Sequence, residues 1–188
     1  MARNTVQLIF GQRLSSFDSV VLAMIRQGIQ PLVLTIPDPQ GGRRVEYEMR
    51  KRKGMNILPA SLGAMRQAGR HLQRGGMVLT GIDRPVSAPR LQPIFFGWPA
   101  PLPTHHIYLA LKNRVPVVLM AVIRQKDGRY NLLSSDLMEL DPYPDHEAAI
   151  LNNAEKVLQQ AEGFIRLAPQ QWNVPLPVWP DLVEQVPD

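Results

Sequence analysis

The chain has 188 residues, with 21 basic and 16 acidic side chains, a formal net charge of +5 and no cysteine. The absence of cysteine excludes disulfides, thiolate zinc sites and a cysteine nucleophile, and it fits a reducing compartment. No apolar run approaches the ~18 residues of a spanning helix, and the polar N-terminus does not resemble a signal peptide. The length predicts a single domain over residues 1–188.

In the first half of the chain, short apolar runs alternate with amphipathic or charged stretches that end at glycine. Apolar runs of this length, bounded by turn residues, predict buried strands, and a helical spacing of apolar residues predicts helices. The expected strands are 6–10, 31–36, 56–59 and 77–80, and the expected helices are 19–27, 43–53 and 61–74.

The second half begins with a proline-rich loop, after which Thr104 is expected to cap a helix that contains Ile107 and Leu111. The most apolar stretch, 115–123, predicts a strand, and a turn at 126–128 leads to an antiparallel strand at 130–134. A long helix is expected over 147–167, with His146 at its cap. The alternation predicts an α/β fold with a mostly parallel central sheet flanked by helices.

Three polar clusters are expected near one edge of this sheet, where α/β proteins bind ligands. They are the loop Gly11–Asp18, the loop Gly81–Pro85 and the basic stretch Arg50–Lys53. Each has a simpler explanation. Asp18 or a neighbouring serine can cap a helix, Asp83 and Arg84 can form a loop ion pair, and Arg50–Lys53 can be a solvated helix face.

The order of several segments resembles the bacterial lysophospholipid and lipid A biosynthesis acyltransferase family. These segments are GQRLSSFDSVVLA, MRKRKGMNILPAS, GGMVLTGIDRP, FFGWPAPLPTHHIYLALKNRVPVVLMAVIR and APQQWNVPLPVWP. The resemblance spans Leu8 to Pro180, and it rests on the order and spacing of the segments together.

The resemblance implies an enzyme that transfers a fatty acyl group to a hydroxyl of a lysophospholipid or glycolipid. The donor would be acyl-CoA or acyl carrier protein, with no further cofactor and no metal. It also implies a cytoplasmic protein, peripheral at the inner face of the cell membrane, with no nucleic-acid partner. Family members usually carry an additional N-terminal segment, which this sequence is expected to lack.

The family signature is a histidine, four residues and then a carboxylate, in which the histidine is the general base. In this sequence the resemblance places the carboxylate at Asp18 and the base position at Arg13. A guanidinium stays protonated and has no acceptor lone pair, so Arg13 cannot act as a base. We expect Arg13 to pair with Asp18 instead, which would impair transfer.

The resemblance assigns supporting roles to residues outside this pair. Asp83 would assist the catalytic residues, and Arg50 would contact phosphate or acceptor head groups. The candidate substrate-binding residues are Ser15, Arg50 and Arg84. None of the four histidines is expected to replace the missing base, because a base must first be positioned by geometry. The four are His71, His105, His106 and His146, and His71 is expected to be exposed.

Two alternatives remain open. A non-catalytic homologue that binds lipid or acyl thioester is favoured by Arg13, whereas a basic α/β module that binds nucleotides or nucleic acid has only its charge in support. Candidate membrane contacts are the basic helix 43–53 and the loop with Phe95, Phe96 and Trp98. Core packing is the competing explanation for the two phenylalanines.

Overall fold

The computed structural model describes residues 7–10, 17–37 and 41–183, with only the backbone described for 7–10, 181 and 183. A six-stranded sheet has the order β3-β2-β4-β1-β7-β8, and every neighbouring pair is parallel except β7 and β8. The strands are β1 (Gln7–Phe10), β2 (Leu32–Thr35), β3 (Asn56–Pro59), β4 (Val78–Gly81), β7 (Val117–Arg124) and β8 (Tyr130–Ser134). The expected α/β fold with a mostly parallel sheet is confirmed.

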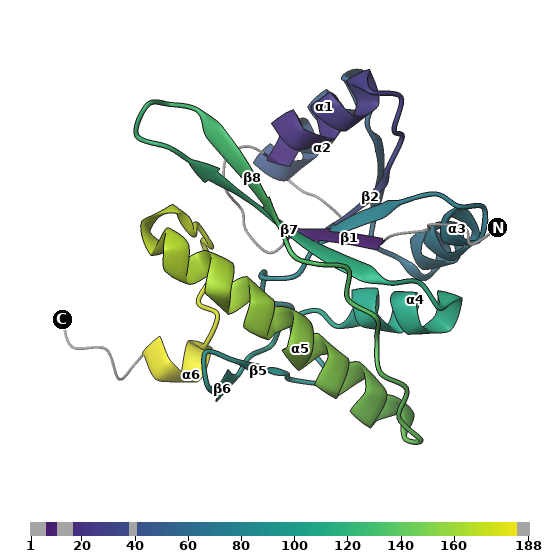
Figure 1. The fold of residues 1–188 in the computed structure, drawn as a ribbon, viewed down its shortest axis with the longest axis vertical. Coiled ribbons are helices and arrows are strands. Elements are labelled where there is room, and N and C mark those ends of the chain that lie inside the picture. The colour runs from purple at the N-terminus through teal and green to yellow at the C-terminus, as the bar shows by residue number, and fades with distance from the viewer. Residues whose placement is uncertain (1–6, 11–16, 38–40, 184–188) are drawn as a thin grey trace.

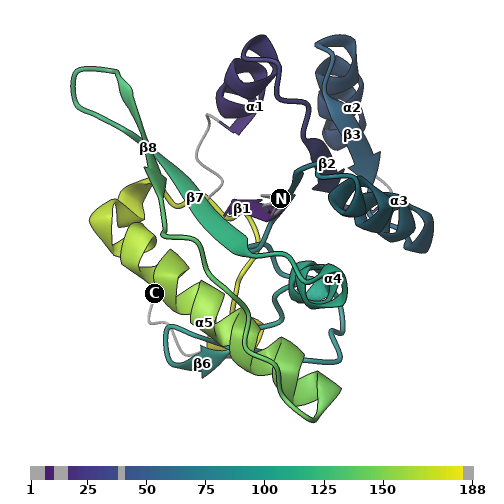
Figure 2. The same cartoon turned by 45° about the vertical axis from the view of Figure 1, so that its right-hand side comes forward.

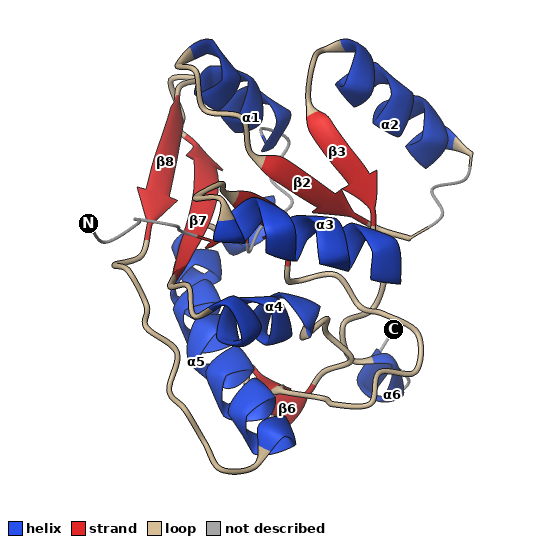
Figure 3. Ribbon diagram, turned by 90° about the vertical axis from the view of Figure 1, so that its right-hand side faces the viewer, coloured by secondary structure: helices blue, strands red, loops and turns tan. Residues whose placement is uncertain are grey.

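Helices cover both faces of this sheet, as Figures 1 and 2 show. One face carries α1 (Phe17–Arg26) and α2 (Gly42–Arg52). The other carries α3 (Leu62–Gln73), α4 (His105–Asn113) and α5 (His146–Leu167), which lie below β2 and β3 in Figure 3. The sequence did not predict the hairpin of β5 (Ile94–Phe95) and β6 (Trp98–Pro99), the 3-10 turn Pro169–Gln171 or the short helix α6 (Pro180–Val183).

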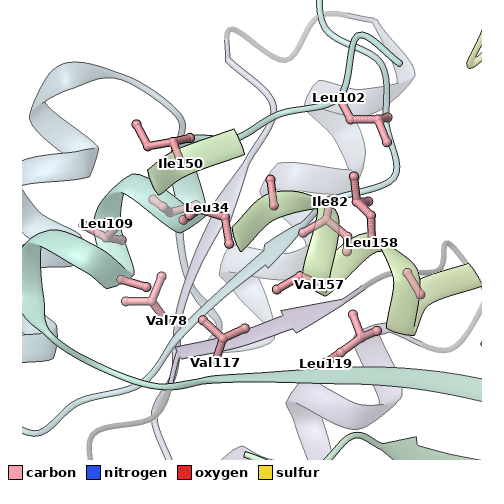
Figure 4. Close-up of a cluster of buried hydrophobic side chains, with 14 of the residues drawn as sticks. Leu34, Val78, Ile82, Leu102, Leu109, Val117, Leu119, Ile150, Val157 and Leu158 are labelled. Atoms are coloured by element: carbon pink, nitrogen blue, oxygen red, sulfur yellow. The ribbon is translucent and has the colours of Figure 1, made fainter. Parts of the chain in front are cut away.

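The alternation of side chains along the strands divides the core into two layers. In β2, Leu32 and Leu34 point into the layer under α3, α4 and α5, whereas Val33 points into the layer under α1 and α2. Figure 4 shows part of the larger layer, in which Val117 and Leu119 of β7 face Val157 and Leu158 of α5. Burial on both faces explains why these strands read as continuous apolar runs.

The hairpin and the C-terminal segment are joined by an aromatic cluster. The Phe95 ring is fully buried, and its centroid lies 4.8 Å from Phe96, 5.8 Å from Trp172 and 5.7 Å from Trp179. Core packing is therefore confirmed for Phe95, whereas Trp98 is 55% exposed. The cluster fixes residues 172–179 against α5 and the hairpin.

The helix caps differ partly from expectation. The Ser61 hydroxyl accepts a hydrogen bond from the Ala64 amide at 3.1 Å, as expected for an N-cap. Thr104 occupies the N-cap position of α4 but makes no side-chain cap bond. The cap of α5 is Asp145, not His146, because its carboxylate accepts from the Ala148 amide at 2.6 Å.

Replacing Gly163 by alanine is expected to stabilise the protein by about 1 kcal/mol, because glycine is an unfavourable residue in a helix interior. Gly163 lies in α5, and a Cβ there would meet no heavy atom within 4 Å. Gly76→Ala is the control and should lower the free energy of unfolding, since its Cβ would overlap the ring of His71. His71 is half-buried, so the prediction that it is exposed was wrong. Urea unfolding measures both; a loss of stability in Gly163→Ala would contradict the prediction.

Candidate active site

A cleft of about 1820 Å³ opens at the carboxyl ends of the parallel strands. Its walls come from residues that follow β2, β3, β4 and β7, from one side of α2, and from the segment 170–176. This is the edge at which open α/β sheets bind ligands. The volume exceeds the ~300–1000 Å³ typical of a site for one small ligand.

Asp18 and Arg50 meet at one wall of the cleft. Asp18 lies in the first turn of α1, where the positive end of the helix dipole favours a carboxylate. The Arg50 Nε donates to Asp18 Oδ1 at 2.8 Å, and the guanidinium carbon lies 5.9 Å from the centroid of the Phe17 ring. This pair bridges α1 and α2. Because the two side chains are 23% and 33% exposed, the pair contributes about 1 kcal/mol or less.

Asp83 lies in the loop after β4, and its side chain is almost completely buried. The Trp172 Nε1 donates to Asp83 Oδ2 at 3.0 Å, so a residue from the C-terminal segment holds a carboxylate that follows a central strand. The neighbouring Arg84 is half-buried and also lines the cleft. The aromatic cluster therefore fixes one wall of the cleft through Trp172.

A histidine that the sequence did not favour also lines the cleft. His105 is the first residue of α4, and its Nε2 lies 3.3 Å from the Thr80 hydroxyl at the end of β4. Burial lowers the pKa of His105 below its usual value of 6.5. The imidazole is therefore neutral at neutral pH and keeps a nitrogen lone pair.

His106 is the next residue, and its ring centroid is 5.8 Å from that of His105. His106 is fully buried, and neither ring nitrogen has a hydrogen-bond partner among the described residues. Burial, with a smaller contribution from the charge that His105 can carry, lowers the pKa of His106 well below 6.5. His106 is therefore a neutral core residue.

The six candidate residues from the sequence divide into two groups. Asp18, Arg50, Asp83 and Arg84 line the same cleft. Arg13 and Ser15 lie outside the described residues, so the expected pairing of Arg13 with Asp18 stays a prediction, and the described partner of Asp18 is Arg50. The catalytic and substrate-binding roles of all six likewise remain predictions.

The described walls of the cleft carry more positive than negative groups. The basic residues are Arg43, Arg50, Arg84, Arg124 and Lys126, and the acidic residues are Asp18, Glu46 and Asp83. Apolar side chains of Val33, Leu34 and Ile57 also contribute to the lining. Within the described part of the chain, no group of three metal-binding side chains occurs, and no helix is long and apolar enough to cross a bilayer.

The sequence pattern of the bacterial lipid A biosynthesis acyltransferases matches residues 38–179. This chain belongs to that acyltransferase family. The matched region contains Arg50, Asp83, Arg84 and His105, whereas positions 13 and 18 precede it. The assignment of those two positions to the catalytic pair therefore depends on the resemblance of the first segment alone.

Two further comparisons add no functional information about this acyltransferase-family protein. No curated protein matches the sequence. The X-ray structure of the Legionella pneumophila ATPase DotB superposes with a TM-score of 0.42 and 11% sequence identity, over 99% of this chain and 62% of that chain. The chain thus spans less than two thirds of the length of DotB.

Proposed function

We propose that this protein transfers a fatty acyl group, within the described cleft, from acyl-CoA or acyl carrier protein to a hydroxyl of a lysophospholipid or glycolipid. Membership of the lipid A acyltransferase family is the observation that carries the proposal. The volume of the cleft supports it, because the cleft has room for a thioester donor beside a lipid acceptor. The proposed place of action is the cytoplasmic face of the cell membrane.

The charge of the cleft suits both substrates. Coenzyme A, the phosphopantetheine arm of acyl carrier protein and phospholipid head groups all carry phosphate. Arg84, Arg124 and Lys126 lie on the described walls and can bind phosphate oxygens. In this proposal Arg50 orients Asp18 through its Nε, while its Nη1 lies 3.9 Å from a carboxylate oxygen of Glu46.

The reaction needs a base that removes the proton of the acceptor hydroxyl, and we propose His105 for this role. It is the one imidazole among the described residues that line the cleft, and Arg13 has no lone pair to offer. The hydroxyl oxygen would attack the thioester carbonyl carbon while its proton moves to the imidazole. The carbon–sulfur bond would then break, and the imidazolium would return the proton to the leaving thiolate. The products are an ester and a free thiol.

Acceptor-dependent release of thiol from acyl-CoA tests the proposal directly. Because the chain contains no cysteine, a thiol reagent such as Ellman's has no background signal from the protein. We expect thiol release in the presence of a lysophospholipid or a lipid A precursor, and little without acceptor. If no acyl-CoA or acyl carrier protein donor gives thiol with either acceptor, transfer is refuted.

Arg13 favours a second candidate, a homologue that binds the ligands without catalysis. This candidate predicts that acyl-CoA or lysolipid raises the melting temperature, because a ligand that binds the native state stabilises it, while no thiol is released. If neither ligand shifts the melting temperature, the second candidate also fails.

Arg13→His is expected to raise the transfer rate, because it restores an imidazole at the base position that the family resemblance indicates. A gain of roughly 10²-fold or more over a weakly active wild type is the size expected for a positioned general base. Arg13→Gln is the matched control, since it removes the charge without supplying a base. Equal rates for the histidine and glutamine variants would show that position 13 does not take part in proton transfer.

A further inference from the structure

The helix α2 forms one wall of the cleft on one side and is open to solvent on the other. Glu46, Tyr47 and Arg50 line the cleft from α2, and Tyr47 also packs against the smaller core layer. No residue of α2 is fully buried. Figures 1 and 3 show α1 and α2 at the end of the molecule opposite α5. The outward side chains of α2 are thus exposed in the described part of the chain, and Lys51 lies over the Tyr47 ring of the same helix at 5.3 Å from its centroid.

This outward side combines apolar and basic side chains. Val45 and Met49, one helical turn apart, are 59% and 51% exposed. Arg52 continues the same line. Arg44 and Lys51 lie to one side of it, with the acidic Glu48 between them and Arg52, and all four side chains are exposed. We call Arg44, Val45, Met49, Lys51 and Arg52 the α2 outer face, whose three cations outnumber the one neighbouring carboxylate.

Much of the positive charge of the chain lies on α2 and its C-cap residue Lys53, with Arg43 and Arg50 on the cleft side. Residues 42–53 contain six basic and two acidic residues, which gives +4, whereas the whole chain carries +5. Cations near an anionic bilayer each favour binding by about 1 kcal/mol, and exposed apolar side chains beside them can enter the head-group region.

We propose that the α2 outer face docks the protein on the surface of an anionic lipid bilayer. Val45 and Met49 would enter the head-group region, and the cations beside them would contact lipid phosphates. Because the other side of α2 lines the cleft, docking would bring the cleft close to the bilayer in which a lipid acceptor resides. The choice of a lipid partner rests on the proposed function.

The apolar pair distinguishes this partner from a nucleic acid. Phosphates of a nucleic acid can pair with Arg44, Lys51 and Arg52, but binding through phosphates alone would leave Val45 and Met49 in water. A bilayer removes the pair from water, and each buried methylene then favours binding. The two partners thus differ in whether the apolar pair contributes to binding.

Vesicle flotation tests the proposal without any acyl transfer. The full chain should bind vesicles of phosphatidylglycerol and phosphatidylcholine, release them at 1 M salt, and bind pure phosphatidylcholine weakly. The triple variant Arg44→Gln, Lys51→Gln, Arg52→Gln should bind anionic vesicles roughly 10- to 100-fold more weakly, since each cation near an anionic surface contributes several-fold. The double variant Val45→Gln, Met49→Gln should weaken binding roughly 10-fold.

Matched controls come from the opposite face of the sheet. Arg66→Gln, Arg70→Gln, Arg74→Gln on and just after α3 removes the same charge from exposed positions, and Leu62→Gln, Leu167→Gln removes two exposed aliphatic side chains. Neither control should change vesicle binding more than about 2-fold, because α3 and α5 lie across the sheet from α2. Melting temperatures verify that every variant is folded.

Three outcomes overturn the proposal. The first would be a wild-type protein that fails to bind anionic vesicles. The second would be an α3 triple variant that loses as much binding as the α2 triple variant. The third would be an apolar double variant that binds as well as wild type, together with displacement of the protein from the vesicles by RNA, which would assign the surface to a nucleic acid. Vesicle binding without thiol release would refute acyl transfer and leave the docking surface standing. Thiol release without vesicle binding would refute the docking surface and leave acyl transfer standing.

Discussion

His105→Gln is expected to lower the rate of acyl transfer at least about 100-fold, because a positioned general base typically contributes 10²- to 10⁴-fold. Glutamine keeps a polar side chain near the Thr80 hydroxyl, which lies 3.3 Å from the His105 Nε2 in the wild type. It cannot take a proton from an acceptor hydroxyl. Thiol release from acyl-CoA measures the loss.

The pH dependence separates a proton-transfer role from a structural one. Because burial lowers the pKa of His105 below 6.5, the wild-type rate should be constant above about pH 6.5 and fall when the imidazole is protonated at lower pH. His105→Gln should lose this limb of the profile. A residual rate with an unchanged acidic limb would assign the base to another group.

The double variant Arg13→His, His105→Gln gives an internal control. If an imidazole at position 13 can serve the same cleft, this variant should recover much of the activity that His105→Gln loses. His106→Gln should not be rescued in this way, because its imidazole lies in the core. Full activity of His105→Gln alone would refute the proposed role of His105.

Acidification below about pH 6.5 is expected to destabilise the protein by up to ~1.4 kcal/mol per pH unit for each buried imidazole. His105 and His106 both have pKa values lowered by burial. Below 6.5 the unfolded imidazoles bind protons that the folded ones do not, so protonation favours the unfolded state. Above 6.5 neither state takes up these protons, and the two residues add no pH dependence.

His106→Leu isolates the larger part of this effect. Leucine has a volume close to that of histidine and adds no polar atom to a site where the ring nitrogens have no described partner. Between about pH 7 and pH 5, the free energy of urea unfolding should fall less steeply for the variant than for wild type. His71→Leu, at a half-buried position on α3, is the control. An unchanged slope in His106→Leu would contradict the assignment.

Much of the fold follows from local sequence patterns. Buried parallel strands produce short apolar runs, so the β2 run 31–36 and the β7 run 115–123 identified their strands to within two residues. The hairpin of β5 and β6 escaped prediction because each strand has only two residues, too few for a periodicity. What holds it is the packing of Phe95 against Trp172 and Trp179, which no local pattern reveals.

The candidate site was predictable where the topology alone determines position. Asp83 follows a parallel strand, so its place at the carboxyl edge could be inferred before its contact with Trp172 was known. His105 was different, because the end of a long proline-rich loop sets where α4 begins. Its position beside Thr80 depends on how α4 packs against α3 and α5, which the spacing of residues 81–104 does not specify.

The position of β1 between β4 and β7 has a consequence for how the chain matures at the ribosome (Figure 1). Of the six strands of this sheet, β1 is made first and ends at Phe10, yet its second neighbour, β7, begins at Val117. At about 5–20 residues per second, translation takes roughly 5–20 s to supply that neighbour. One edge of β1 in the nascent chain therefore stays without its strand partner until Val117 and the residues after it have been made.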